Sequence, residues 1–532
     1  MNDMRQDRVL ITCRFLSILM CGLFVEGSAR AATPGIKGPT FTLTAKDSYI
    51  SQPDGQAIYS WGYGCSGAQP TLVPTMLNAT CPSMQIPGPT LIVNEGDVVT
   101  VTLTNNLPNA AGNTSILFPG FMVSTTGGVA GLLTQEAMPG GTVTYQFTAT
   151  TPGTRAYYSG SQGDLQVEMG LYGAVIVVPT QTSTFSASCG NSVGVATTLN
   201  QTARQYWKEQ DFRLATAAYD HPSSCYDREY LFQFSEIDPR IHKQVETGVG
   251  LSKCGPGACP ALNVQTEPYH PTYFMVNGRS MPDDMDPNYA LEYPHQPYNG
   301  NPHMHPGELV LLRVIGQGRW QHPFHEHGNH VRVLARDGNL MVSQTDPTKL
   351  AGPLLFTTTT TPGLAMDGIF YWTGKGLNWD VYGHNKADSP TSAANLPCTP
   401  DVNGYNTLGT AYQQINFYEW CADHHKPLEK APFGDVEGGG PATLPDPNYL
   451  TNGTWFGGSA YLGPDATIRS TGPKGTTPPS GTVANSPSTE AGFAFMWHSH
   501  NEREITTNNV FPGGMMMMML VDSREFQIDE AN

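Results

Sequence analysis

The chain has 532 residues, of which 28 are Lys or Arg and 45 are Asp or Glu, so its formal net charge is -17. This acidic balance argues against a protein that binds nucleic acid non-specifically, because such a protein needs a basic surface. Hydrophobic residues make up 39% of the chain, which excludes wholesale disorder, whereas 57 Gly and 43 Pro exclude a protein built from long helices.

The first 31 residues have the pattern of a secretory signal. Three Arg residues precede an apolar run over residues 15–25, and Ala29-Arg30-Ala31 supplies small residues for cleavage. The run is too short to span a bilayer, and no later segment is long and apolar enough to do so. We therefore expect residues 1–31 to be removed and the mature protein to be exported to the periplasm, the outer surface or the medium.

Export would place the cysteines in an oxidising compartment. Eight of them follow the signal, and an even number in such a compartment favours disulfides. The simplest connectivity joins neighbours along the chain: Cys65–Cys81, Cys189–Cys225, Cys254–Cys259 and Cys398–Cys421. No Cys-x-x-Cys pair is present, so a cysteine zinc site is not expected.

Short β-rich runs separated by Gly, Pro and Asn begin at Thr40. They predict a first β-sandwich or barrel domain over residues 40–180. A connector rich in Ser, Thr and Ala then covers residues 181–225. The predicted strands of the first domain include Thr90–Leu103, Thr142–Thr148 and Gly173–Val178.

A second set of strands predicts a second domain over residues 226–522. Residues 384–490 hold repeated Pro, Gly, Asn and Thr, and we interpret them as a loop-rich insertion, because ordinary connections are far shorter. No segment of the mature chain shows strong amphipathic helical periodicity, so the fold class is all-β. The predicted strands are Glu229–Ser235, Tyr273–Val276, Glu308–Ile315, His330–Ala335, Gly368–Trp372, Ala491–Trp497 and Met515–Val521.

All fifteen His residues lie at or after position 221, and they include two His-x-His pairs, His325/His327 and His498/His500. In an extended strand, residues i and i+2 share a face, so the two rings of each pair point the same way. If the two strands are neighbours, four imidazoles converge, a donor set suited to copper, zinc, nickel or iron. The alternative is two unrelated surface pairs.

The segments around these pairs resemble the multicopper oxidases, the laccase-like cupredoxin family. HPFHEHG (322–328) is similar to the family's HPxHxHG, and WHSHNEREITTNNVFPGGMM (497–516) to its HCHxxxHxxxGM. IPGPTLIVNEGDVVTVTLTNNLP and GLYGAVIVVP resemble strands of the family's first domain, and VNGRSMP the start of a later one. The resemblance implies tandem cupredoxin-like Greek-key β-sandwich or barrel domains, two rather than three, with copper as the cofactor.

The chain departs from the family's pattern in its first domain. Leu117 and Pro119 stand where the motif TSxHWHG has His, and Tyr158 and Gly160 stand where GTxWYHSH has His. Four of the eight histidines of the family's trinuclear copper cluster are therefore missing, and the two His-x-His pairs match the other four. This loss explains why the first 220 residues contain no His.

The type 1 copper position is also altered. His322 keeps one ligand position, but Ser499 replaces the Cys and Glu504 stands where the second His belongs. The blue centre depends on a thiolate, which a Ser hydroxyl cannot replace. His322, Glu504 and Met515 could bind a harder ion weakly, or His322 could be a hydrogen-bonded residue at a strand end.

Other candidates are weaker. His303 and His305, with His295 nearby, could complete the depleted cluster, although a solvated loop is the simpler interpretation. The run Met515–Met519 offers thioethers that suit Cu(I), but alternating Met in a strand is more typical of a core. Three carboxylates could hold or orient ligands from an outer position: Glu326, Glu502 and Glu504.

Three functions remain open. The first is a copper-dependent oxidoreductase with fewer than four copper ions and a small reductant or metal ion as donor. Ordinary laccase-type reduction of O₂ is not expected, because the thiolate and half of the cluster ligands are missing. The second is a copper-binding or carrier protein without turnover. The third is a structural cupredoxin-fold protein that binds partners. A homo-oligomer in which another chain completes the site is compatible with the sequence, whereas nucleic acid and a transmembrane span are not expected.

Overall fold

The computed structural model describes residues 33–68, 70–73, 79–180, 213–252, 254–255, 258–260, 262–305, 308–372, 458–462, 491–522 and 528. The predicted leader and most of the predicted insertion lie outside these ranges. Among the described residues, no helix combines the length and the apolar character that crossing a bilayer requires.

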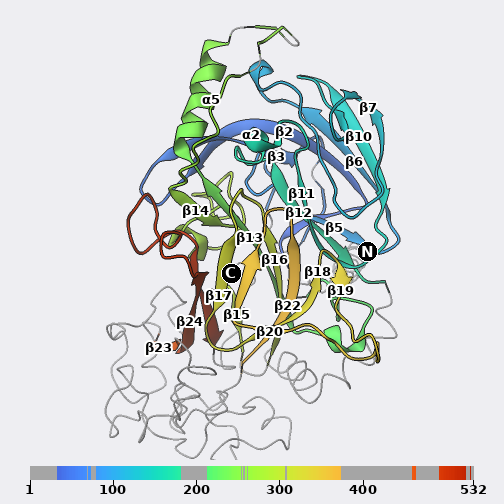
Figure 1. Ribbon diagram of the computed structural model, residues 1–532, viewed down its shortest axis with the longest axis vertical. Coiled ribbons are helices and arrows are strands. Elements are labelled where there is room, and N and C mark those ends of the chain that lie inside the picture. The colour runs from blue at the N-terminus through green and yellow to red at the C-terminus, as the bar shows by residue number, and fades with distance from the viewer. Residues whose placement is uncertain are drawn as a thin grey trace, which may run out of the picture.

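The first part of the chain folds into two five-stranded sheets (Figure 1). Apolar residues of both sheets, such as Leu91 and Val175 from one and Val101 from the other, share a single core. One sheet has the order β11 (Gly153–Tyr158), β12 (Tyr172–Val178), β5 (Leu91–Asn94), β1 (Gly35–Lys37) and β4 (Leu72–Val73). The other has the order β3 (Ala57–Cys65), β2 (Thr40–Ser51), β6 (Val98–Asn105), β10 (Thr142–Thr148) and β7 (Ser124–Gly127), and a short pair joins β8 (Val129–Ala130) to β9 (Gln135–Glu136).

Strand β10 shows why these residues form a sandwich. Its sequence TVTYQFT alternates, so Val143, Tyr145 and Phe147 are buried while the residues between them are not. Its bounds are those predicted. The predicted strand Thr90–Leu103 instead forms two strands, β5 and β6, because Gly96 takes a φ of +86° in the turn between them.

The second part, residues 228–522, also folds into two sheets. Their strands come from segments before, within and after the predicted insertion. The first sheet has the order β14 (Tyr273–Val276), β13 (Arg228–Ile237), β16 (Leu309–Gly316), β22 (Ala365–Tyr371), β18 (Val331–Arg336) and β19 (Asn339–Leu340), with β20 (Leu354–Leu355) beside β18. The second has the order β15 (His303–Met304), β25 (Met516–Asp522), β24 (Ala491–Ser499), β17 (His322–Glu326) and β21 (Thr357–Thr360), with β23 (Gly458–Leu462) beside β24.

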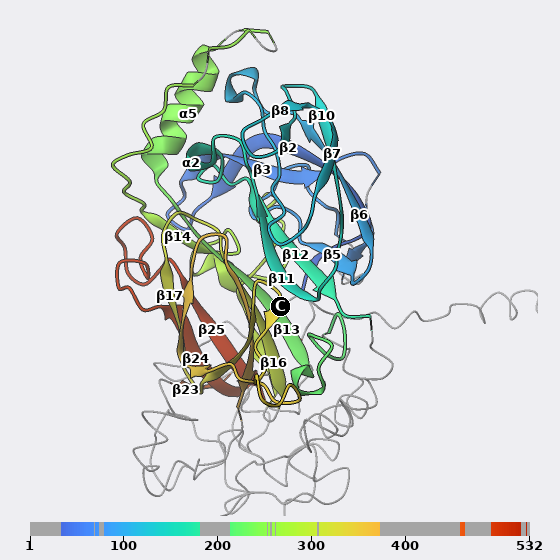
Figure 2. The same ribbon diagram turned by 45° about the vertical axis from the view of Figure 1, so that its right-hand side comes forward.

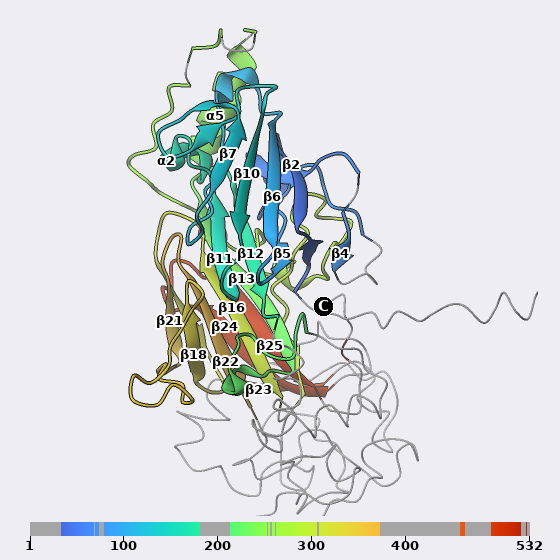
Figure 3. The same ribbon diagram turned by 90° about the vertical axis from the view of Figure 1, so that its right-hand side faces the viewer.

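The two sandwiches lie one above the other in Figure 3, and each has its own apolar core. The all-β class with tandem β-sandwiches is therefore confirmed. Within the predicted insertion, the described residues show one strand, β23, which pairs with β24.

One helix was not predicted from the sequence. Helix α5 (Pro239–Leu251) begins at Asp238, whose side chain accepts a hydrogen bond from the N–H of Arg240, and Pro239 occupies its first turn. Ile241 and Val245 bury the inner face of the helix against the core of the first sandwich. The remaining helices are short: α2 (Gly163–Gln166), η2 (Asn109–Ala111), η3 (Pro222–Ser224) and η4 (Asp283–Met285).

The two sandwiches contact each other through β11 of the first and β16 and β22 of the second. Thr154 donates hydrogen bonds to the Asp367 carboxylate from its N–H (3.1 Å) and its Oγ1 (2.6 Å), and Arg313 donates to that Oγ1 at 3.1 Å. All three residues are buried. The sheet that carries β17 and β24 is the other sheet of the second sandwich and lies on the side away from the first sandwich (Figure 2).

Two of the four predicted disulfides are present, Cys65–Cys81 and Cys254–Cys259. Each of the other two predicted pairs includes a residue outside the described ranges.

Candidate metal centre

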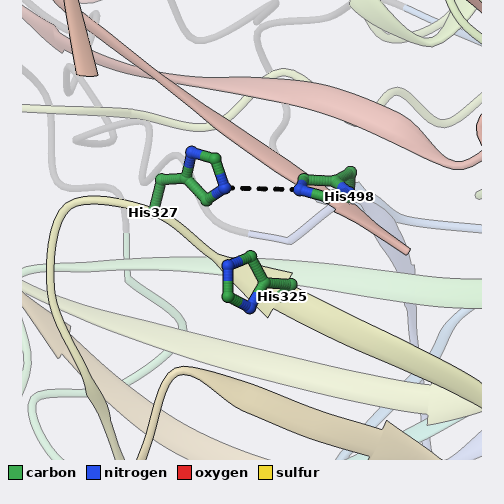
Figure 4. A group of neighbouring side chains, drawn as sticks. All are labelled: His325, His327 and His498. Atoms are coloured by element: carbon green, nitrogen blue, oxygen red, sulfur yellow. Dashed lines mark hydrogen bonds between the residues drawn. The ribbon is translucent and has the colours of Figure 1, made fainter. Parts of the chain in front are cut away.

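The structure brings the two His-x-His pairs together. Strands β17 and β24 are antiparallel neighbours, and His325 lies directly opposite His498. The ligand nitrogens of His325, His327 and His498 all lie within 4.8 Å of one another, and Figure 4 shows the three rings facing a common point. The His500 ring joins them, with its centroid 4.7 Å from that of His325. We call these four residues the four-His group.

Two of the four rings, those of His325 and His498, each form a hydrogen bond to an oxygen atom through Nδ1. The Nδ1 of His498 lies 2.7 Å from the carbonyl oxygen of Ser499, and the Nδ1 of His325 lies 2.6 Å from the Oγ1 of Thr357. Metal-binding imidazoles commonly use one nitrogen in this way, because the hydrogen bond fixes the orientation of the other. His325 and His498 are 3% and 7% exposed, whereas the side chain of His500 is 53% exposed.

The environment keeps the buried rings neutral. Burial, followed by the positive charge that neighbouring rings would carry, lowers the pKa of His325 to about 4. Burial also lowers the pKa of His498. Both imidazoles are therefore uncharged at pH 7, and a metal binds only the uncharged form.

The spacing and chemistry of the group fit a metal ion. The Nε2 atoms of His327 and His498 are 3.3 Å apart. Two nitrogens that bind one tetrahedral ion at about 2 Å each would be separated by about the same distance. Imidazole suits copper as well as zinc, nickel and iron, so the residues fit the copper that the family resemblance implies.

His322 lies apart from the four-His group, on the opposite face of β17, which faces the core. Its Nδ1 is 2.8 Å from the Oε2 of Glu504, and its Nε2 is 2.9 Å from the Oε2 of Glu236. Burial by itself lowers the pKa of His322, but the hydrogen bonds and charges of the two glutamates outweigh burial and raise the pKa to about 9. The altered type 1 position therefore contains a protonated imidazole between two carboxylates, where the sequence suggested a weak metal site or a strand-end hydrogen bond.

Two other residues of the type 1 position have related roles. Ser499 donates a hydrogen bond from its Oγ to Glu504. Met515 is fully buried in the core together with Met517 and Met519, which confirms that these alternating Met residues are core residues. That Met515 could bind an ion together with His322 and Glu504 stays a prediction.

The remaining histidine candidates are not part of the four-His group. The ring of His295 hydrogen bonds with the Oγ of Ser48 and the carbonyl oxygen of Met84, both in the first sandwich. His303 lies in β15 and is paired with Leu520 of β25, whereas His498 is paired with Met516 at the other end of β25. His305 directly follows β15. The structure therefore brings none of these three to the metal centre.

The candidate carboxylates differ in their surroundings. Glu326 is fully buried, accepts a hydrogen bond from Thr358, and has a pKa raised well above its usual value by burial. Glu502 is exposed, with one oxygen 3.9 Å from the Nδ1 of His500. Sequence reasoning missed Glu236 and Thr357. Glu236 continues the core-facing register of β13, and a charged residue in such a register is a signal that could have revealed it.

In the first sandwich, closely packed residues stand at the positions where the family motifs have His. Leu117 pairs with Tyr158 through a β-bridge. A Cβ added to Gly160 would lie 2.8 Å from the Leu117 side chain, so these residues are in close contact. The first sandwich thus has no imidazole at these positions.

The multicopper oxidase family model matches residues 77–182. Laccase abr2 of Aspergillus fumigatus is 41% identical over 98 residues, which cover 18% of this chain and 16% of the relative. L-ascorbate oxidase of Cucurbita pepo var. melopepo is 40% identical over 100 residues (18% and 17%). The copper-containing nitrite reductase of Pseudomonas chlororaphis is 34% identical over 107 residues (20% and 28%). The chain thus spans roughly a sixth to a quarter of the length of these curated relatives.

Solved structures are also similar. The multicopper oxidase mgLAC has a TM-score of 0.43 at 16% identity, over 92% of this chain and 87% of that chain. The blue copper oxidase from Nitrosomonas europaea has a TM-score of 0.43 at 14% identity, over 91% and 85%. Residues 77–182, in the first sandwich, thus match the multicopper oxidase family, and the HPFHEHG and HSH motifs in the second sandwich resemble that family's copper-ligand motifs.

Proposed function

We propose that this chain is an exported copper-binding protein that holds copper in its second cupredoxin-like domain. The ligands are His325, His327, His498 and His500. The observation that supports this proposal most strongly is the pairing of β17 with β24, which sets His325 opposite His498 and the Nε2 of His327 3.3 Å from that of His498. Remnants of a lost site would not be expected to retain converging rings, two of which, His325 and His498, are buried.

A copper ion held by imidazoles supplies a one-electron couple between Cu(I) and Cu(II). The protein's own residues hold and orient the ligands: Thr357 and the carbonyl of Ser499 each fix one ring. We do not expect the family's usual reduction of O₂, which draws electrons through a copper-bound thiolate. Ser499 stands in that place, and its hydroxyl is hydrogen bonded to Glu504.

Because His500 is exposed, metal ions or electron donors in solution can reach the proposed centre. Its side chain is 53% exposed, whereas His325 and His498 are buried. A small reductant or a metal ion could approach from this side. The proposal therefore includes a copper-dependent oxidoreductase that uses such a donor, and a copper carrier is the alternative without turnover.

Export is supported by the leader-like sequence of residues 1–31 and by the disulfides Cys65–Cys81 and Cys254–Cys259. Disulfides persist in oxidising compartments outside the cytoplasm. The proposed mature protein has a first domain over residues 40–180, without metal ligands, and a second over 226–522 with the four-His group.

Copper titration of the purified, metal-free protein tests the proposal. The wild-type protein should retain copper after gel filtration, without an intense blue colour. His325→Ala and His498→Ala should each weaken binding by at least about 100-fold, because each removes a direct ligand. His270→Ala, which removes an exposed His elsewhere, is the matched control. Equal copper retention in all four proteins, or none in the wild type, would overturn the proposal, and O₂ uptake with a phenol or metal-ion donor distinguishes an oxidoreductase from a carrier.

A further inference from the structure

Next to the metal centre, both carboxylate oxygens of Glu504 accept hydrogen bonds. Its Oε2 accepts hydrogen bonds from the Oγ of Ser499 and from the Nδ1 of His322, and its Oε1 accepts one from the Nδ2 of Asn501 at 2.9 Å. Glu504 is 1% exposed. A buried carboxylate with bonds on both oxygens fixes the position of every group that donates to it, because losing one bond would leave a buried charge unsatisfied.

The other side of His322 is anchored to the opposite sheet of the sandwich. Its Nε2 donates to the Oε2 of Glu236 in β13, and the Oε1 of Glu236 accepts hydrogen bonds from the N–H groups of Arg319 (2.6 Å) and Trp320 (2.9 Å). His322 and Glu236 are 0% and 2% exposed. The unit Glu236–His322–Glu504 therefore joins β13, β17 and the loop after β24 with charge-assisted hydrogen bonds, which are stronger than neutral ones. We call this unit the carboxylate clamp.

Ser499 connects the clamp to the metal centre. It stands between His498 and His500 in the sequence, and its carbonyl oxygen accepts the hydrogen bond from the Nδ1 of His498. Its hydroxyl donates to Glu504 and accepts from the N–H of Asn501 at 3.3 Å. The backbone of Glu504 is held as well, because its carbonyl oxygen accepts a hydrogen bond from the N–H of Met515 at 2.8 Å. The position of Ser499 thus depends on Glu504 through its side chain.

We propose that Glu504 is a positioning residue of the metal centre, which acts through Ser499 to orient His498 and to hold the start of the loop that carries His500. This inference rests on the proposed function, because it assigns a role toward copper that the four-His group binds. The position that in the family corresponds to a type 1 copper ligand is here used to hold the ligands of the other site. In the carboxylate clamp, the protonated imidazole of His322 is the positively charged partner of two buried carboxylates, Glu236 and Glu504.

The test compares Glu504→Gln with Glu308→Gln in the full-length protein. Glu308 forms a buried ion pair with Arg228 in the same sandwich, directly before β16, and is not hydrogen bonded to Ser499 or His322, so its loss controls for general destabilisation. Glu504→Gln should weaken Cu(II) binding about 10- to 100-fold, the usual cost of removing a group that orients a ligand. Its Cu(II) electron paramagnetic resonance spectrum should also change. Glu308→Gln should lower the melting temperature but leave copper affinity and the spectrum as in the wild type.

Ser499→Ala provides a second variant if Glu504→Gln does not fold. It removes the hydroxyl that links the clamp to the loop and should weaken Cu(II) binding in the same direction, with a changed spectrum. Wild-type affinity and an unchanged spectrum in the folded Glu504→Gln or Ser499→Ala protein would overturn the positioning role. Absence of copper from the wild-type protein would instead refute the proposed function, so the two failures are distinguishable.

Discussion

His325 and His498 lie directly opposite each other in the antiparallel ladder of β17 and β24, with ring centroids 5.4 Å apart. Because they share this register, His327 and His500 are carried to the same face of the sheet. The same two strands present His322 and Ser499 to the core. One pair of strands thus holds two chemically different sites, a group of four converging imidazoles on its outer face and an ion-paired imidazole on its inner face.

The buried ring of His325, on the outer face of the strand pair, should remain uncharged in mildly acidic solution. His325 has a pKa of about 4, because burial and the neighbouring rings disfavour its protonated form. An ordinary imidazole titrates near pH 6.5, so the unfolded chain takes up this proton first and stability falls as the pH drops from 6.5 toward 4. Imidazole NMR signals of the metal-free protein should show one ring that stays neutral at pH 5, and a titration of that ring near 6.5 would contradict this.

The inner site should have the opposite pH dependence. The folded-state pKa of His322 is about 9, above the value near 6.5 of the unfolded chain. Its stabilising contribution, on the order of 3 kcal/mol, is therefore complete below pH 6.5 and is lost as the pH rises through 9. Thermal unfolding of the metal-free protein should show a decline in melting temperature between pH 6.5 and 9. A flat profile across that interval would show that His322 is not held as a cation.

Copper-loaded protein should not be blue. The intense visible band of a type 1 centre arises from a copper-bound thiolate, and Ser499 offers a hydroxyl that is already hydrogen bonded to Glu504. An absorption spectrum of the protein after copper loading checks this directly. A strong blue band would mean that a Cys elsewhere in the chain supplies the ligand.

The Met-rich final strand should contribute to stability through its inward-facing residues. Met517 is fully buried in the core of the second sandwich, so Met517→Ala should cost about 2–5 kcal/mol. Met122 is 96% exposed, and Met122→Ala should change stability by no more than about 0.5 kcal/mol. Denaturant unfolding of the two variants against the wild type measures the difference, and equal stabilities would place Met517 outside the core.

Local periodicity was enough to predict many of the strands. Alternation predicted β10 with its bounds, and a short apolar run predicted β14 (Tyr273–Val276) in the same way. Helix α5 was missed because its apolar face is narrow, with Ile241 and Val245 as its buried apolar residues. Its Asp238-Pro239 start is a capping signal that could have indicated it.

The candidate site shows the same division between local and long-range information. The two His-x-His pairs could be predicted because i, i+2 spacing is a property of a single strand. The role of Glu236 could not, because its contact with His322 joins residues 86 positions apart on opposite sheets. The pairing that made His322 a cation depends on this contact, so the sequence left a weak metal site and a hydrogen-bonded residue as alternatives.

An anomalous-difference map at the copper absorption edge, from crystals of the copper-loaded protein, tests the central claim most directly. The account predicts one strong peak about 2 Å from the Nε2 atoms of His327 and His498, on the outer face of β17 and β24. A peak between His322 and Glu504, or none near the four-His group, would contradict it.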